Sequence, residues 1–178
     1  MPKPKPLFVT ERLSCRRWFL QDLQALVKVY GDADAMRWVG DGVAITPDEC
    51  RDWLAVTENN YQTRGYGMFA LEDRVTRVVV GFCGLVHPDG QIEAEIKYAL
   101  KRHFWGHGLA TEAARALLAY GANTHGVDYV IATTAPENAA SHRVLLKAGM
   151  AKGQLRRDED GSYTQLFEWR PAGSPNTA

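Results

Sequence analysis

The sequence predicts an α+β domain: a mixed, mostly antiparallel β-sheet flanked by helices, with one parallel pair of strands. Three observations predict it. Two helical patterns stand near the N-terminus, short β-type runs follow in the middle of the chain, and a strand–helix–strand crossover comes after them. A crossover through a helix makes its two strands parallel, whereas strands joined by short turns pair antiparallel. We therefore expect a single sheet of mixed direction.

The length and composition of the chain fit one compact domain. The 178 residues are 46% hydrophobic and 24% charged, and a chain of this size can bury a core without disulfides or a metal. We expect one domain over residues 8–171. A flexible tail rich in proline and lysine is expected at 1–7 and a second flexible tail at 172–178.

The charge balance and the apolar runs argue against several classes of partner. Lys plus Arg number 21 and Asp plus Glu number 21, so nothing in the overall charge favours nucleic acid. No apolar run approaches the roughly 20 residues that span a bilayer, and the start lacks the apolar segment of a secretory signal. Cys15, Cys50 and Cys83 form no metal-binding or disulfide pattern. We expect a cytoplasmic protein that binds neither nucleic acid nor membrane nor metal.

The first half is expected to hold one strand and two helices. Leu13–Phe19 is β-type and predicts the first strand. Asp22 precedes apolar residues at helical spacing that end at Gly31, which predicts the first helix. Thr46–Glu49 has the form of a capping box with proline at the first helical position. A second helix is therefore expected to begin there.

The second half alternates between strands and helices. Glycines end both predicted helices, and turn residues separate the β-type runs. The expected elements are, in order, strands at Tyr66–Leu71, Val78–Val86 and Gln91–Leu100, a helix at 111–124 ended by Gly126, a strand at Val127–Thr133, a helix at Ala139–Ala148 ended by Gly149, and strands at Met150–Arg156 and Tyr163–Arg170.

A glycine-bearing loop ahead of the third helix is the clearest candidate for a ligand site. Gly106 and Gly108 let the backbone approach a ligand closely and leave amide groups unpaired. Such amides, with the positive end of the helix dipole, suit a phosphate or pyrophosphate, although a plain loop would show the same glycines. A P-loop needs a lysine after the glycines, which is missing here. A dinucleotide fingerprint needs a third glycine where Thr111 stands, and its acidic residue lies at the far end of the following strand, whereas Asp128 is expected at the start of that strand. Both differences argue against a dinucleotide site.

Two further segments carry polar residues with either a chemical or a structural explanation. Asn138 can cap a helix, and Ser141 shares its helix face, so capping alone would explain them. Glu93, Glu95 and Lys97 share one face of a predicted strand. If that face met solvent, they would be ordinary surface charges.

Together, the segments AEIKYAL (94–100), WGHGLATEA (105–113) and ENAASHRVLLKAGM (137–150) resemble the GNAT superfamily of N-acetyltransferases. Residues 9–40 resemble its branch of ribosomal-protein N-terminal acetyltransferases of RimJ/RimL type. The resemblance covers roughly residues 8–170. It implies a parallel strand pair splayed around acetyl-CoA as donor, with a protein N-terminal α-amine or a small-molecule amine as acceptor, and it leaves a homodimer open.

The resemblance also implies which residues contact the coenzyme. The loop amides would hold the pyrophosphate, the end of the preceding strand would pair with pantetheine, and the start of the late helix would supply further contacts. Trp105 stands where the superfamily has Gln or Arg, so that polar contact is lost. The implied contacts are Ala99, Leu100, Lys101, Gly106, His107, Gly108, Leu109, Ala110, Thr111, Asn138 and Ser141.

Acetyl transfer to an amine needs a neutral amine, a stabilised oxyanion and support for the departing thiolate. Glu95 matches a position where family members place a general base, directly or through water. The amide of Ala99 is the candidate oxyanion donor. Ser141 is the candidate on the thiolate side, by hydrogen bonding rather than full proton donation. Tyr98 ranks below Ser141 because alternation places it on the face opposite Glu95.

Two other functions remain as alternatives. A non-catalytic acyl-CoA-binding module is the second hypothesis, because the binding loop is better marked than any catalytic residue. A nicotinamide-dependent enzyme ranks third.

Overall fold

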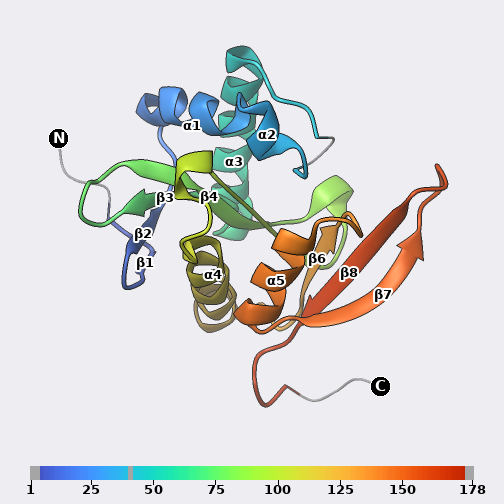
Figure 1. Ribbon diagram of the computed structural model, residues 1–178. Coiled ribbons are helices and arrows are strands. Elements are labelled where there is room, and N and C mark those ends of the chain that lie inside the picture. Colours follow the sequence, from blue (N-terminus) through green and yellow to red (C-terminus); the bar gives the residue numbers. More distant parts are fainter. Residues whose placement is uncertain (1–4, 40–41, 175–178) are drawn as a thin grey trace.

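The computed structural model describes residues 5–39 and 42–174, which form one eight-stranded sheet with helices on both faces (Figure 1). The strands lie in the order β1-β2-β3-β4-β5-β6-β8-β7. Their bounds are β1 Phe8–Val9, β2 Leu13–Arg16, β3 Met68–Asp73, β4 Val79–Val86, β5 Ala94–Leu100, β6 Val130–Thr134, β7 Ala151–Arg157 and β8 Tyr163–Trp169. The helices are α1 Leu23–Tyr30, α2 Ala33–Met36, α3 Pro47–Arg64, α4 Leu109–His125 and α5 Ala139–Ala148, with short 3₁₀ turns at Leu20–Asp22, Pro88–Gly90 and Arg102–Phe104.

The directions of the strands confirm the predicted α+β class. All neighbouring strands run antiparallel except β5 and β6, which are parallel and joined through α4. The parallel ladder is short, because it pairs only Ala94 with Val130 and Glu95 with Ile131. Strand β5 continues beyond that point to Leu100 without pairing to β6.

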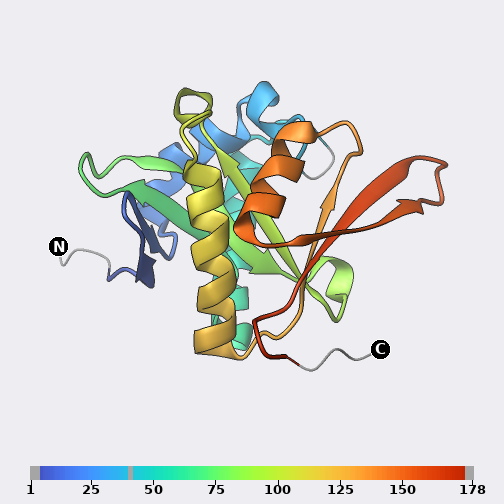
Figure 2. The ribbon, with the colours of Figure 1, turned by 60° about the horizontal axis from the view of Figure 1, so that its bottom comes forward.

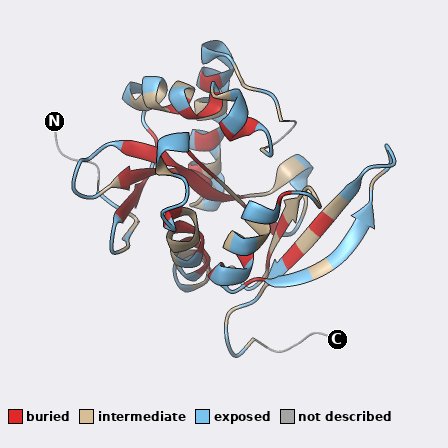
Figure 3. Ribbon diagram, in the orientation of Figure 1, coloured by how far each residue is buried: buried red, intermediate tan, exposed pale blue. Residues whose placement is uncertain are grey.

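Two apolar cores lie on the two faces of the sheet. Helices α1, α2 and α3 cover one face, and α4 and α5 lie side by side on the other (Figures 1 and 2). Successive side chains of β5 point to opposite faces of the sheet, so β5 contributes to both cores. Ile96 and Leu100 pack with α4 and α5, whereas Ala99 packs with α1 and α2. Strand β7, at the edge of the sheet, is exposed along nearly its whole length (Figure 3).

The helix boundaries follow the signals read in the sequence. At α3, the Thr46 hydroxyl accepts from the Glu49 amide and the Glu49 carboxylate accepts from the Thr46 amide, which is the predicted capping box. Helix α4 ends at Gly126, which adopts the left-handed conformation that favours glycine.

The N-terminal region differs most from the sequence-based expectation. The predicted strand at Leu13–Phe19 ends at Arg16, because the chain then leaves the sheet and turns into a 3₁₀ segment. Strand β1 and helix α2 are short and were not predicted. The predicted tails at 1–7 and 172–178 fall largely outside the described residues, but the Leu7 amide bonds to the Cys15 carbonyl at 2.8 Å.

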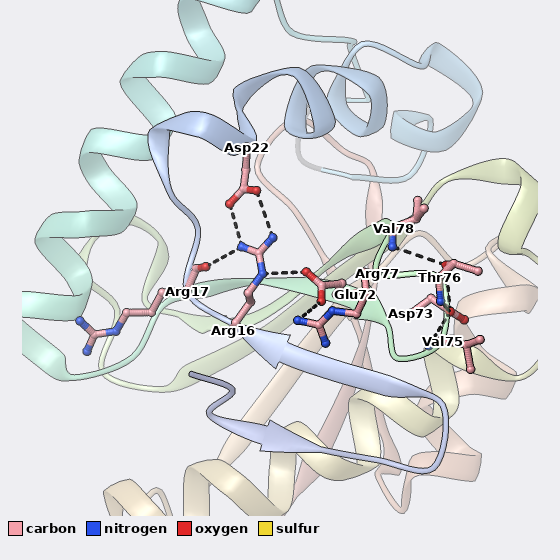
Figure 4. A network of polar contacts seen from close by, with 9 residues as sticks. All are labelled: Arg16, Arg17, Asp22, Glu72, Asp73, Val75, Thr76, Arg77 and Val78. Atoms are coloured by element: carbon pink, nitrogen blue, oxygen red, sulfur yellow. Dashed lines mark hydrogen bonds and ion pairs between the residues drawn. The ribbon is translucent and has the colours of Figure 1, made fainter. Parts of the chain in front are cut away.

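A buried ion network ties this region to the sheet (Figure 4). The Arg16 guanidinium donates to Glu72 at 3.0 Å and in bidentate fashion to Asp22 at 2.7 and 3.0 Å. Arg77 pairs with the second oxygen of Glu72 at 2.8 Å. Arg16 and Glu72 are 5% and 4% exposed. The network therefore joins β2, β3 and the start of α1.

Across residues 5–39 and 42–174, no helix is long and apolar enough to cross a bilayer.

Candidate functional site

A cleft of about 840 Å³ opens where β5 ends and α4 begins. One wall is α2 and the residues after it, and the opposite wall is the face of α5. The floor is the end of β5, and the glycine loop with the first turn of α4 closes one end. The segments singled out in the sequence thus meet around one cavity.

The glycine loop presents the start of α4 to this cleft. Gly106 and Gly108 both have φ of 78°, a left-handed conformation that other residues adopt at a cost. Gly108 is the N-cap of α4 and has no side chain that could accept from the first amides of the helix. The residues that carry those amides, Leu109, Ala110 and Thr111, line the cleft. Unpaired helix N-terminal amides of this kind suit an anion.

The turn between β1 and β2 holds the glycine loop in place from outside. The Glu112 carboxylate accepts from the Thr10 hydroxyl at 2.5 Å, from the Arg12 amide at 2.8 Å and from the Arg12 guanidinium at 2.7 Å. Arg12 also donates to the His107 carbonyl at 2.8 Å. Burial alone would raise the pKa of Glu112, but the hydrogen bonds from Thr10 and Arg12, together with the Arg12 charge, hold it below its ordinary value.

Replacing Glu112 by glutamine is expected to lower the free energy of unfolding by about 1 kcal/mol at pH 7. A carboxyl group whose pKa is depressed by folding contributes stability above its unfolded pKa, and that contribution is lost as the pH falls through the folded value. The difference between wild type and Glu112→Gln should therefore shrink below about pH 4. Urea titrations at pH 7 and at a pH below about 4 measure this difference in the free energy of unfolding. Glu159→Gln, at the exposed β7–β8 turn, is the control. An equal difference at both pH values would contradict the charge-based account.

The end of β5 turns some backbone groups into the cleft and others away from it. Ala99 and Leu100 line the cleft. The Lys101 amide bonds to the Val80 carbonyl of β4 at 2.8 Å, and backbone groups alternate sides along a strand. The amide of Ala99 therefore points to β4 as well. The amides of Tyr98 and Leu100 point to the opposite side, where β6 no longer pairs.

A smaller cavity of about 50 Å³ lies in the opening between β5 and β6. Ile96, Lys97 and Tyr98 line it from β5, and residues 132–134 line it from β6. It shares five lining residues with the large cleft, so the two cavities meet. The shared residues are Trp38, Val39, Tyr98, Asn138 and Ser141.

Three polar side chains stand at the junction of the two cavities. The Asn138 side-chain carbonyl accepts from the Ser141 amide at 3.1 Å, so Asn138 caps α5 and also lines both cavities. The Ser141 hydroxyl lies 2.6 Å from the Tyr98 hydroxyl. The expected capping role and the expected site role of Asn138 are therefore compatible.

Glu95 is buried at the vertex where β5 and β6 separate, with an exposed fraction of 3%. Its carboxylate forms an ion pair with Lys97, accepts from the Thr133 hydroxyl and accepts from Gln91 at 3.2 Å. The surface-charge explanation for Glu95 is therefore wrong. Glu95 does not line either of the two cavities, although its partners Lys97 and Thr133 line the smaller one.

Two of the eleven implied coenzyme contacts stay outside the cleft. The Lys101 amine donates to the Val79 carbonyl on β4, and His107 is exposed with its carbonyl bound by Arg12. The other nine line the cleft: Ala99, Leu100, Gly106, Gly108, Leu109, Ala110, Thr111, Asn138 and Ser141.

Sequence reasoning missed the wall that α2 contributes. Asp34 and Arg37, which no sequence pattern singled out, line the cleft beside Trp38. Arg102 holds this wall by pairing with Asp32 at 2.7 Å and with Asp34 at 2.9 Å. A four-residue helix carries too little periodicity to be found. Arg143 and Lys147, also missed, share a helix face with Ala140, because they follow it at the i+3 and i+7 positions, and all three line the cleft.

Within the described part of the chain, no group of three or more His, Cys, Asp or Glu side chains could hold a metal ion.

Comparison with known proteins gives the family. Residues 12–151 match the acetyltransferase (GNAT) domain. The chain is 34% identical over 149 residues to the uncharacterized protein YkkB of Bacillus subtilis, covering 82% of this chain and 86% of that protein. An acetyltransferase of the GNAT family from Bacillus anthracis shares the fold with a TM-score of 0.77 at 24% identity, over 91% of this chain and 96% of that one. RimL, the ribosomal L7/L12 α-N-protein acetyltransferase, in complex with CoA, shares it with a TM-score of 0.79 at 16% identity, over 93% and 98%. The chain therefore belongs to the GNAT family of acetyltransferases.

Proposed function

We propose that the protein transfers the acetyl group of acetyl-CoA to a primary amine, by direct attack of the amine through a tetrahedral intermediate. The observation that carries the proposal is the junction of the two cavities. A diphosphate held by the α4 amides would leave an extended coenzyme lying along the large cleft, with its thioester at the junction. The opening between β5 and β6 would then admit the amine from the other side.

The proposed coenzyme contacts are the nine implied residues that line the cleft. RimL, a structural neighbour of this chain, holds CoA, which supports the same ligand here. In place of the Ala99 amide, we assign the oxyanion to the amides of Tyr98 and Leu100, because they point into the opening.

An α-amine is the acceptor that the chemistry favours. Deprotonation at pH 7 costs about 4.6 kcal/mol for a lysine amine of pKa about 10.4 but only about 1.4 kcal/mol for an α-amine near 8. The Glu95 carboxylate already accepts from three donors, and deprotonating an α-amine asks less of it than deprotonating a lysine amine. We therefore propose a protein N-terminus or a small molecule with an α-amine as acceptor, as in the RimJ/RimL-type branch. The free, buried cysteines suit a reducing cytoplasm.

A turnover assay tests the proposal. The protein is incubated with acetyl-CoA and a panel of peptides, amino acids, polyamines and aminoglycosides, and released CoA is followed with a thiol reagent. We expect release with at least one α-amine and an acetylated product in the mass spectrum. CoA binding without release across the whole panel would favour the acyl-CoA-binding module instead.

Glu95→Gln is expected to slow acetylation of an α-amine by up to about tenfold at pH 7, because only about a tenth of such an amine is neutral there without a base. The loss should vanish near pH 9, where the amine is already neutral. CoA affinity, measured by calorimetry, should stay unchanged. Glu93→Gln, on an exposed residue of the same segment, is the control. A rate equal to wild type at pH 7 would remove Glu95 as the base.

A further inference from the structure

The hydroxyls of Tyr98 and Ser141 form a pair at the junction of the two cavities. They come from β5 and from the first turn of α5, and their oxygens lie 2.6 Å apart. The Tyr98 hydroxyl also lies 3.5 Å from the Ser141 carbonyl. Both residues line both cavities. The pair therefore stands where the proposed function needs a hydrogen bond to the coenzyme sulfur.

The chemistry of the two groups sets the direction of the hydrogen bond. A phenol is a stronger acid than an alcohol, and so it is the better donor. When Tyr98 donates to the Ser141 oxygen, the serine O–H is left for another acceptor. A helical serine otherwise often turns its hydroxyl back to the carbonyl four residues earlier. The contact with Tyr98 holds the Ser141 oxygen at the cavity instead.

We propose that Tyr98 is a positioning residue for acetyl transfer: its phenol fixes the Ser141 hydroxyl so that the serine O–H donates to the sulfur of the departing coenzyme. This inference rests on the proposed function. The reaction forms a C–N bond and breaks the C–S bond, whose electron pair stays on sulfur. The amine loses one proton, to Glu95 through water and from there to solvent, and the thiolate takes one proton from water. Tyr98 and Ser141 lend hydrogen bonds and undergo no net change.

Burial supports a positioning role over an acid role. It raises the pKa of Tyr98 to about 12, although the hydrogen bond with Ser141 opposes the shift. A thiol has a pKa of about 8.5, so its thiolate is too weak a base to take the phenol proton. A rigid, neutral phenol is what the alignment of the serine requires.

Two separate measurements on the full chain test the inference. In turnover assays, Tyr98→Phe is expected to lower kcat about three- to tenfold, with the KM for acetyl-CoA changed by less than about twofold. In the complex with CoA, ultraviolet absorbance reports the thiolate as the pH is raised. Tyr98→Phe should raise the pKa of the bound CoA thiol, so that the thiolate-to-thiol ratio at a given pH falls about three- to tenfold.

Matched variants separate the inference from its alternatives. Ser141→Ala should reproduce both effects, and the double variant should add little to either single one, because the two side chains act as a unit. Tyr120→Phe removes a phenol that bonds His125 at 3.1 Å, near the far end of α4, and should change neither measurement. A Tyr98→Phe variant with wild-type kcat and wild-type CoA thiol pKa would overturn the inference. So would a variant that loses only CoA affinity or thermal stability, since the pair would then merely join α5 to the sheet.

Failure of the proposed function would be recognised separately. Wild-type protein that binds CoA but acetylates no amine contradicts the proposed function, whatever Tyr98→Phe does. Active wild-type protein with an unaffected Tyr98→Phe variant contradicts only the role of Tyr98.

Discussion

Replacing Arg16 by methionine is expected to lower the free energy of unfolding by about 3–5 kcal/mol. Arg16 is 5% exposed and holds the carboxylates of Glu72 and Asp22. Methionine fills much of the same space but leaves two poorly solvated carboxylates without this partner, and Arg77 reaches only Glu72. The cost of removing one member of a buried ion network lies mainly in the charges that stay behind. Urea unfolding at pH 7 measures the change.

Arg51→Met is the matched control for Arg16→Met. Arg51 pairs with Asp48 on the surface of α3, where the two side chains are 57% and 91% exposed. Such pairs contribute at most about 1 kcal/mol, so this variant should unfold close to wild type. Equal losses in the two variants would show that burial of the Arg16 network adds nothing to its strength.

Gly108→Ala is expected to weaken CoA binding about 5- to 30-fold. An alanine with φ of 78° is strained by about 1–2 kcal/mol. The chain can relieve this strain by rotating the loop, but the rotation turns the first amides of α4 away from the diphosphate. Acetyl-CoA turnover at low coenzyme concentration should fall by a similar factor, and kcat at saturation should fall less. Calorimetry with CoA measures the change in CoA affinity directly.

Gly90→Ala separates backbone strain from coenzyme binding. Gly90 has φ of 74°, and a Cβ there would meet no atom within 4 Å, so the strain resembles that at Gly108. The residue lies in the turn between β4 and β5 and is not part of the cleft. Gly90→Ala should lose stability and keep its CoA affinity. Loss of affinity in this variant too would mean that general destabilisation, rather than the loop amides, weakens binding.

The longer elements were predictable because each carries a local signal. The capping box at Thr46–Glu49 and the glycine at Gly126 mark helix ends through backbone bonds that need no distant partner. The two-residue strand β1 and the four-residue helix α2 lack such signals, since both depend on the elements they pack against. Strand β2 ends at Arg16, whose guanidinium holds Glu72 of β3, a residue 56 positions away, and no local pattern encodes that contact.

The candidate site was predictable where chemistry depends on backbone geometry. Gly106 and Gly108 predicted a loop that leaves the first amides of a helix unpaired, and in the structure both glycines are left-handed and lie directly ahead of α4. The sequence also placed Tyr98 on the strand face opposite Glu95, but the contact of Tyr98 with Ser141 joins residues 43 positions apart. No local pattern encodes that contact. The burial of Glu95 depends in the same way on β6 and on Gln91 folding against it.

The short parallel ladder between β5 and β6 divides the sheet into two hydrogen-bonded units. Strands β1–β5 form one continuous unit and β6–β8 another, and only two residue pairs connect them. Side-chain contacts add to this connection, such as the bond from Arg115 on α4 to the Lys147 carbonyl on α5. Because a ladder of two residue pairs protects few amides, we expect the amides along this line to exchange with solvent sooner than those of the antiparallel ladders on either side, and native-state hydrogen exchange measures the difference.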